Sequence, residues 1–444
     1  MKKSLLTPCL MALLFISCSP DEEVFVNPPE ETLLQDRLTL LYGDLEALKL
    51  PNSYDLGNIP SDPNNPLTEP KVVLGKLLFH ETGLAQNPTK SEGRGTYSCA
   101  ACHHANAGFQ SGMQQGIGEG GFGFGQIGES RTISSDYLPT EIDVQPILSP
   151  TILNTAYQDV MLWNGQFGGT KTNTGTENSW TEGTPKAVNH LGFEGLESQA
   201  IAGMGVHRLT CDKELLDSMG YIPYFDAAFP DVDETEKYSA TYAGLAIAAY
   251  ERTVLATEAP FQQWLNGNNS AMTEDEMKGA ILFFGKANCY ACHNGPGLNS
   301  TTFHALGMLD FSEDQVFGVV DETIKRGRGG FTLNSDDDYK FKTPTLYNLK
   351  DVKFFGHGGS FTSVKEVIDY KNKGIVENSA IGTTNISPLF VPLGLTDEEI
   401  DQLTTFIENA LHDPDLDRFA PASLPSGNCF PVADNQSKTD MGCN

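Results

Sequence analysis

Two short segments combine cysteine and histidine at a spacing that can hold a porphyrin. They are Cys99-Ala100-Ala101-Cys102-His103 and Cys289-Tyr290-Ala291-Cys292-His293. In each, two thiols three positions apart can form thioethers with the vinyl groups of one porphyrin, and the imidazole that follows can ligate its iron. A redox-active CxxC pair does not need the histidine, and a zinc site would need both pairs close together in space. The sequence therefore predicts two covalently bound haem c groups, one in each half of the chain.

The coordination of the two irons would separate an enzyme from an electron carrier. A carrier needs both irons six-coordinate, whereas an enzyme acting on peroxide needs one open iron face and a polar group that moves protons. The chain has 9 histidines, and after His103 and His104 the next is His190. His104 is bonded directly to the ligand residue and cannot reach the opposite face of the same haem. We therefore expect an open first haem, with a distant His, Met or Lys as the alternative sixth ligand.

Helices separated by long irregular segments are expected to position both motifs. Each half follows the same order of helix, CxxCH motif, irregular segment and closing helices. No apolar–polar alternation is long enough for a sheet. The predicted fold is therefore mainly α, with two cytochrome c-like haem domains and long irregular loops. The expected helices cover 31–50, 73–78 and 235–255, and two more begin at capping boxes formed by Thr273 with Glu276 and by Thr396 with Glu399.

The first residues have the pattern of an export signal. Lys2 and Lys3 precede an apolar run over 10–16 that is too short to span a bilayer. The run ends just before Cys18 in a sequence resembling a lipoprotein cleavage site, which makes Cys18 the predicted lipidation site. An ordinary secretory signal is the alternative. The mature protein is expected in the periplasm or at the cell surface, as a lipid-anchored outer membrane lipoprotein.

The chain is expected to divide into five parts, with the boundary between the two halves at Pro260. In a compartment that oxidises thiols, Cys429 and Cys443 are predicted to form a disulfide in the last part. The expected parts are a signal peptide with the lipidated cysteine at 1–18, a tether and N-terminal helical wrap at 19–70, a first haem domain at 71–260, a second haem domain at 261–420 and a tail at 421–444.

The formal net charge of −29 narrows the range of partners. Nucleic acid and anionic membrane surfaces would be repelled by a protein this acidic. Small neutral substrates and protein partners with a basic patch remain compatible with it.

Further motifs surround the two haem segments in a fixed order, from about Leu74 to Leu411. In this order they resemble the bacterial di-haem cytochrome c peroxidase family, which includes the MauG-type enzymes. Single motifs of this kind are weak, whereas the whole ordered set is specific. The segments are 74–79 (LGKLLF), 149–154 (SPTILN), 163–165 (WNG), 249–253 (AYERT), 285–287 (GKA), 295–296 (GP), 303–304 (FH), 341–346 (FKTPTL) and 357–361 (HGGSF).

The resemblance implies a division of labour between the haems. The first haem, held by Cys99, Cys102 and His103, would be the low-potential centre that reduces hydrogen peroxide to water. The second, held by Cys289, Cys292 and His293, would receive electrons from a small cytochrome or a similar one-electron donor. Trp163 falls where the family places a tryptophan between the haems, with core packing as its alternative role. The resemblance also allows a homodimer.

Departures from the family pattern concern the distal side of the first haem. In many members a histidine at the position of Glu119 blocks the peroxidatic iron until activation, so this chain is expected to be open without prior reduction. The segment that precedes the family's distal glutamate is present, and its Gln199 is a further candidate for the distal site. The glutamate itself is replaced by Leu209. We expect the neighbouring His207 to move protons, with a purely structural His207 as the alternative.

The second haem and the family's calcium site also depart from the pattern. The family takes its sixth ligand, Met or Tyr, from the helix after His357, where Lys371 is the aligned residue. Its neighbour Tyr370 is the ligand we expect, with Met308 as the other candidate. Leu148 replaces the asparagine that contributes to the calcium site. Calcium held by backbone carbonyls near 352–354 therefore remains a weak expectation.

Two alternatives to a peroxidase remain open from sequence. One is a MauG-like di-haem oxidase that applies the same chemistry to a protein or organic substrate, which the replacement of the activation histidine favours. The other is a non-enzymatic di-haem electron-transfer protein, which would need six ligands on both irons.

Overall fold

The computed structural model describes residues 29–312, 317–318, 320–379, 381–382 and 385–443. The predicted signal peptide, the lipidation site Cys18 and the first part of the tether lie outside these residues. Within the described part, no helix is both long and apolar enough to cross a membrane.

Helices supply most of the regular structure, and the mainly α prediction is confirmed. The described strands are two residues long and form two antiparallel pairs, β1 (Gly121–Phe122) with β2 (Thr132–Ile133), and β3 (Phe303–His304) with β4 (Phe341–Lys342). The α-helices are α1 (Glu30–Tyr42), α2 (Glu69–His80), α3 (Gly195–Val206), α4 (Lys213–Ser218), α5 (Ile222–Ala228), α6 (Glu234–Lys237), α7 (Ala240–Thr253), α8 (Pro260–Leu265), α9 (Glu274–Phe283), α10 (Glu322–Lys325), α11 (Arg328–Thr332), α12 (Val364–Lys373), α13 (Asp397–Thr405) and α14 (Asn435–Asp440).

Local sequence signals explain where several helices begin and end. The capping boxes expected at Thr273 and Thr396 are both present and begin α9 and α13. The helix expected over 235–255 is interrupted, which corrects the sequence prediction. Tyr238 leaves the helical path because its hydroxyl donates to Asp226 of α5 at 2.7 Å. The helix expected over 31–50 ends at Tyr42, since Gly43 takes φ 77° at its C-terminus.

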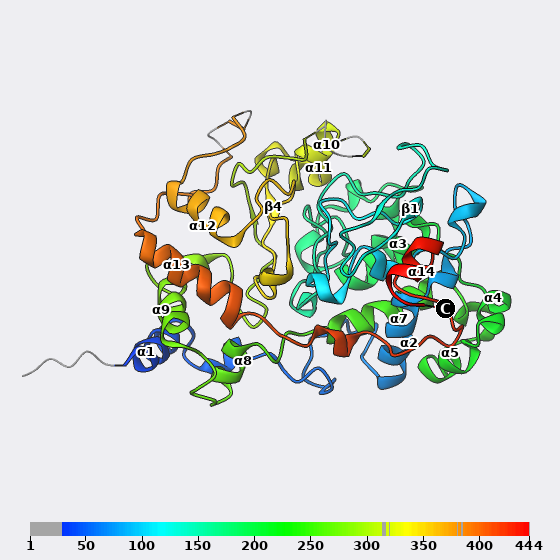
Figure 1. Ribbon diagram of the computed structural model, residues 1–444, viewed down its shortest axis with the longest axis horizontal. Coiled ribbons are helices and arrows are strands. Elements are labelled where there is room, and N and C mark those ends of the chain that lie inside the picture. Colours follow the sequence, from blue (N-terminus) through cyan, green and yellow to red (C-terminus); the bar gives the residue numbers. More distant parts are fainter. Residues whose placement is uncertain (1–28, 313–316, 319, 380, 383–384, 444) are drawn as a thin grey trace, which may run out of the picture.

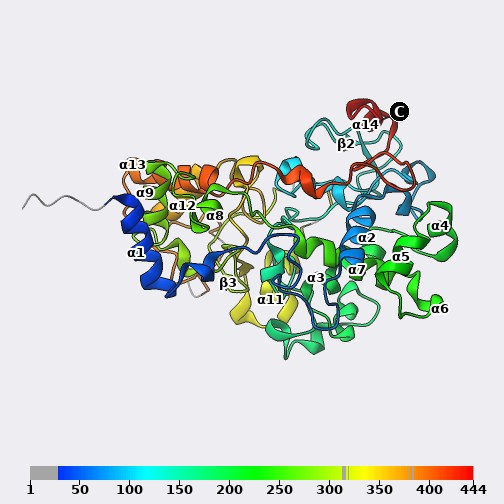
Figure 2. The ribbon, with the colours of Figure 1, turned by 90° about the horizontal axis from the view of Figure 1, so that it is seen from below.

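The helices form two lobes side by side (Figure 1). The first lobe is built around α7, which packs against both α2 and α3, and the second around α9, α12 and α13. Both chain ends cross to the lobe of the opposite half. Helix α1 packs on α9 at the far end of the second lobe, while the C-terminal α14 lies beside β1 in the first lobe (Figures 1 and 2).

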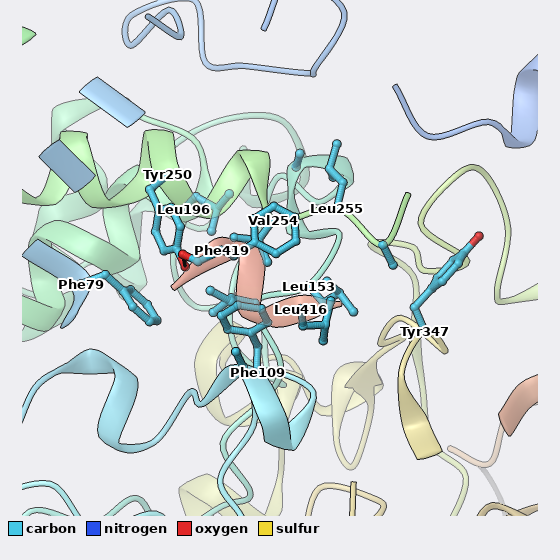
Figure 3. Packing of buried hydrophobic residues seen from close by; sticks show 14 of the residues in the cluster. Phe79, Phe109, Leu153, Leu196, Tyr250, Val254, Leu255, Tyr347, Leu416 and Phe419 are labelled. Atoms are coloured by element: carbon cyan, nitrogen blue, oxygen red, sulfur yellow. Dashed lines mark hydrogen bonds between the residues drawn. The ribbon is translucent and has the colours of Figure 1, made fainter. Parts of the chain in front are cut away.

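A continuous apolar core joins the lobes. Figure 3 shows Phe109, Val254 and Phe419 packed together, so residues from three distant parts of the chain meet at one place. The rings of Phe109 and Phe419 lie 6.2 Å apart. Since all three side chains are fully or nearly fully buried, the segment after α13 is held firmly against the first lobe.

The C-terminal tail is closed into a ring and fastened to the first haem motif. Cys429 and Cys443 form a disulfide with a Cα–Cα distance of 5.8 Å. The Ser98 hydroxyl, next to the first motif, donates to the carbonyl of Pro431 at 2.8 Å. The tail therefore belongs structurally to the lobe that holds the first motif.

Candidate haem sites

The first CxxCH motif forms a 3₁₀ turn that presents its histidine with one ring nitrogen already engaged. The turn spans Cys99–Ala101, and His103 follows within one turn. The His103 Nδ1 lies 3.3 Å from the carbonyl oxygen of Phe109, which leaves Nε2 available for a metal. Both thiols are free, and Gly116 lies so close that a Cβ there would be 2.7 Å from the Cys102 Sγ. The residues present fit a covalently attached haem.

The second motif repeats this geometry beside a cavity. Its 3₁₀ turn spans Cys289–Ala291, and the His293 Nδ1 lies 3.2 Å from the Leu298 oxygen and 3.0 Å from the Pro344 oxygen. The free thiols of Cys289 and Cys292 and the His293 ring line a largely apolar cavity of about 250 Å³. A buried apolar cavity next to two thiols and an oriented imidazole likewise fits a haem.

An imidazole–carboxylate pair lies near the first motif. His207 caps the C-terminus of α3, and its Nδ1 is 2.7 Å from Oδ2 of Asp143. The Asp143 side chain is 9% exposed and that of His207 33% exposed, so the ring is held on one side and accessible on the other. This is the arrangement that fixes the tautomer and orientation of a proton-transferring histidine.

The electrostatics of this pair favour the protonated form of the histidine. Burial lowers the pKa of His207, but the Asp143 carboxylate raises it by more, so the net pKa lies above its ordinary value. Burial raises the pKa of Asp143, but His207 lowers it by more. Burial also lowers the pKa of His103 to about 4, and the charge of His207 adds to this decrease. The two imidazoles are therefore close enough to interact electrostatically.

Glu119, at the position of the family's blocking histidine, forms a second ion pair next to the first. Its fully buried carboxylate lies 2.6 Å from the Nε of Arg208. It also accepts a hydrogen bond from the Tyr137 hydroxyl at 3.0 Å. Arg208 takes φ 55°, a conformation that few non-glycine residues adopt. The end of α3 is thus tied to the loop after the first motif by two adjacent charged pairs, which hold Glu119 in place.

Gln199 lies on the same face of α3 as His207. A Cβ at Gly203 would contact the Nε2 of Gln199 and the Cδ2 of His207, each at 3.8 Å, so the two side chains flank Gly203. The structure thus brings together two of the three residues predicted to be catalytic. Leu209 is buried and apolar, so it offers no proton-transferring group in place of the family's glutamate.

The loop that carries Glu119 is organised by a buried arginine. Arg131 donates to the carbonyls of Ile117, at 2.5 Å, and Gly118, at 2.7 Å. Its remaining nitrogen lies 3.3 Å from Asp434 of the disulfide-closed tail. The tail therefore neutralises the cation that shapes one wall of the first haem site.

Trp163, the third predicted catalytic residue, lies where the two halves meet. It lines the cavity of the second motif, and its Nε1 donates to the carbonyl of Leu148 at 2.8 Å. Its ring meets His357 of the second half edge to face, with centroids 6.5 Å apart. The Leu148 side chain is apolar and offers no oxygen to a calcium ion, and its carbonyl accepts the hydrogen bond from Trp163. Calcium near this position stays a prediction.

The three candidates for the sixth ligand of the second haem iron differ in orientation. Met308 and Lys371 line the cavity. Tyr370 is 7% exposed, and its hydroxyl donates to the carbonyl of Leu306 at 2.6 Å. Its ring packs between Phe361 and Phe390, with centroids 5.1 Å from each. The Tyr370 side chain is therefore engaged in packing, while Lys371 points into the cavity.

Three features of the sites were not predicted from sequence: Asp143 as the partner of His207, the Glu119–Arg208 pair and the position of Lys371 in the cavity wall. Asp143 lies 64 residues from His207 and carries no local signal that would link them. The pairing of Glu119 with Arg208 also has no local sequence signal, because the two residues are far apart along the chain. Lys371 did have a readable signal, because Val364, Ile368 and Lys371 share one helical face.

Two CxxCH sites with an imidazole–carboxylate pair beside the first indicate a di-haem c-type oxidoreductase. A model of the di-haem cytochrome c peroxidase family matches residues 69–270. Cytochrome-c peroxidase IdrP1 of Denitromonas iodatirespirans is 31% identical over 382 residues, covering 81% of this chain and 86% of that protein. Methylamine utilization protein MauG of Methylorubrum extorquens is 27% identical over 84% of this chain and 86% of its own. A crystal structure of a MauG-like protein associated with microbial copper homeostasis has a TM-score of 0.55 at 23% identity, over 83% of this chain and 97% of that one.

The chain belongs to the di-haem cytochrome c peroxidase family. The predictions of the family and of an oxidoreductase of the cytochrome c peroxidase class are confirmed. Haem c is the cofactor of this family, and peroxide and a redox partner are its general reactants.

Proposed function

We propose that this protein reduces hydrogen peroxide to water at its first haem site, with electrons delivered through the second from a small cytochrome or a similar one-electron donor. Cys99, Cys102 and His103 would hold one covalent haem c, and Cys289, Cys292 and His293 the other. When bound, the two haems supply the iron at which peroxide reacts and the two electrons that the reduction consumes.

The His207–Asp143 pair carries the proposal, because it supplies the proton transfer that peroxide reduction requires. Asp143 holds Nδ1 of His207 in its protonated form and thereby presents Nε2 as the basic nitrogen. Nε2 takes a proton from one peroxide oxygen and returns it to the other, which then leaves as water. The pKa of His207, raised by Asp143, favours holding the proton between the two steps.

Two other side chains would support this chemistry. Gln199 flanks the same part of α3 as His207 and can donate a hydrogen bond toward a bound peroxide. Trp163 places a large π system beside the second motif, against His357, and would carry electrons from the second site to the first.

Steady-state peroxide consumption by the holo-protein, with and without prior reduction, tests the proposal. We expect turnover in both conditions, and a loss of roughly 10²- to 10⁴-fold in kcat/KM in His207→Ala. His412→Ala is a matched control, because His412 also pairs with an aspartate, Asp351, but has no proposed role in proton transfer. Unchanged turnover in His207→Ala would remove the proton-transfer role. No high-spin iron and no reaction with peroxide would indicate an electron carrier instead.

A MauG-like oxidase is the second candidate, and Glu119 is the observation that favours it. A buried carboxylate held by Arg208 and Tyr137 occupies the position of the blocking histidine, which suits a site that is open without activation. Under this alternative the same oxidising power would act on a protein or organic substrate. Peroxide consumption that stays slow with every cytochrome donor but rises with such a substrate would favour the oxidase.

Cellular location and assembly complete the proposal. Lipidation at Cys18, export to the periplasm or cell surface, a homodimer and a calcium ion are proposed from the sequence alone. Metabolic labelling with a fatty acid, compared between the wild type and Cys18→Ser, would test the lipid anchor.

A further inference from the structure

One face of helix α12 forms a wall of the cavity beside the second CxxCH motif. The residues of α12 that line the cavity are Val364, Val367, Ile368 and Lys371. They follow the spacing i, i+3, i+4, i+7, which places them on a single helical stripe. Three of them are apolar and pack around the cavity. The fourth, Lys371, places its amine in the same cavity.

Lys371 has no hydrogen bond or ion pair with any residue that the structure describes. No aspartate or glutamate is found among the described residues that line the cavity. The other lysine of the cavity wall, Lys342, donates from Nζ to the side-chain oxygen of Gln158. Buried cations are normally paired, so an unpaired lysine amine in an apolar cavity indicates a partner that the cavity is built to receive.

Lys371 faces the edge of the cavity where the thioethers would form. It interacts electrostatically with Cys289 and Cys292, and also with His293. The propionates of a porphyrin are attached opposite its vinyl groups, so a haem held by these cysteines directs its carboxylates away from this edge. The iron is then the group within the cavity that can accept the lone pair of this amine.

The two other candidates are less suited to this role. Tyr370 is one position away on α12 and does not line the cavity, and its hydroxyl already donates a hydrogen bond to the Leu306 carbonyl. Met308 does line the cavity, but its Sδ packs against Gly356, 3.2 Å from where a Cβ would be. A thioether in apolar packing needs no partner, whereas a buried amine does.

We propose that Lys371, through Nζ, is the axial ligand opposite His293 on the iron of the second haem. This assignment rests on the proposed function only in requiring a haem at the second motif. One Fe–N bond forms as a bound water leaves, and the ammonium releases one proton to solvent. No electron is transferred. A lysine ligand makes the second site six-coordinate and so separates it from the open first site.

The test is the axial-ligand signature of the oxidised holo-protein, read by electron paramagnetic resonance and near-infrared magnetic circular dichroism. We expect one low-spin ferric haem with two nitrogen ligands in the wild type. Lys371→Ala and Lys371→Arg should each convert that haem to a high-spin or water-ligated form, since a guanidinium keeps the charge but does not ligate. Tyr370→Phe and Met308→Leu should retain the wild-type signature.

The outcomes separate this assignment from its rivals. A histidine–methionine or histidine–tyrosinate signature in the wild type overturns it even where no variant folds. An unchanged signature in Lys371→Arg also overturns it and indicates a purely electrostatic role. Intact mass and far-ultraviolet circular dichroism verify that each variant keeps two haems and its fold. Peroxide turnover is measured on the same samples, so an inactive protein with a lysine signature refutes the proposed function and leaves this assignment standing.

Discussion

Replacing Asp143 by asparagine removes the charge that holds His207 while keeping the size of the side chain. The carboxylate lies 2.7 Å from the His207 Nδ1. A hydrogen bond to a charged group contributes about 1.5–3 kcal/mol. Because a third of the His207 side chain is exposed, solvent screening favours the lower end of this range. Asp143→Asn should therefore remove about 1.5 kcal/mol of this interaction and lower the pKa of His207.

The sign of the effect on activity follows from the role of the base. His207 must be neutral to accept a proton, so the peroxide reaction rises with pH through the pKa of His207. Asp143 raises that pKa, and Asp143→Asn should therefore move the acidic limb of the rate profile to lower pH. Arg208 opposes Asp143 and is unchanged in the variant, while His103 is a second titratable neighbour.

The assay is the pH dependence of kcat/KM for hydrogen peroxide, measured by stopped flow on the reduced holo-protein. Asp143→Asn should also lower the rate at the optimum, because the amide no longer imposes one tautomer. In a double-mutant cycle with His207→Ala, the second change should have little further effect. An acidic limb that stays at the wild-type pH in Asp143→Asn, or additive losses in the cycle, would refute the reasoning.

Three further predictions concern the first lobe. Glu119→His should make peroxide turnover depend on prior reduction, with Glu119→Gln as the control that stays independent of it. Gly116→Ala should destabilise the holo-protein by about 1–3 kcal/mol, because its Cβ would lie 2.7 Å from the Cys102 Sγ; an unchanged Tm and full haem content would contradict the crowding. Replacing both Cys429 and Cys443 by serine should cost about 3 kcal/mol of unfolding free energy, since the disulfide closes a short loop. Denaturant titration measures this, and no loss of stability would mean that the tail is held by its other contacts.

The parts of the site that could be predicted from sequence are those carried by short, local patterns. The CxxCH spacing predicted both haem motifs, and the capping boxes at Thr273 and Thr396 predicted where two helices begin. The ordered family motifs around them led to the family that the relatives establish. In each case the residues that act together are neighbours along the chain, or keep a fixed order in the family.

The parts that could not be predicted depend on contacts between distant segments. The helix expected over 235–255 broke at Tyr238 because a partner on α5 outcompeted the helical path. Asp143 belongs to an irregular loop whose course is set by Arg131, and no periodicity links it to His207. The side of α12 that faces the cavity is set by tertiary packing. The sequence pattern therefore favoured Tyr370 as the ligand, whereas Lys371 is the residue that lines the cavity.

The exchange of chain ends between the lobes has a consequence for biogenesis. Asp434 near the C-terminus neutralises buried Arg131 of the first lobe, while α1 near the N-terminus packs on α9 of the second. Neither lobe can reach its final form until almost the entire polypeptide has been synthesised. Porphyrin attachment at Cys99 and Cys102 would therefore take place before the C-terminal tail has packed on the first lobe. Formation of the Cys429–Cys443 disulfide would follow it. Expressing either half by itself would leave an uncompensated arginine or an uncovered helix face, so the two halves are one unit of maturation.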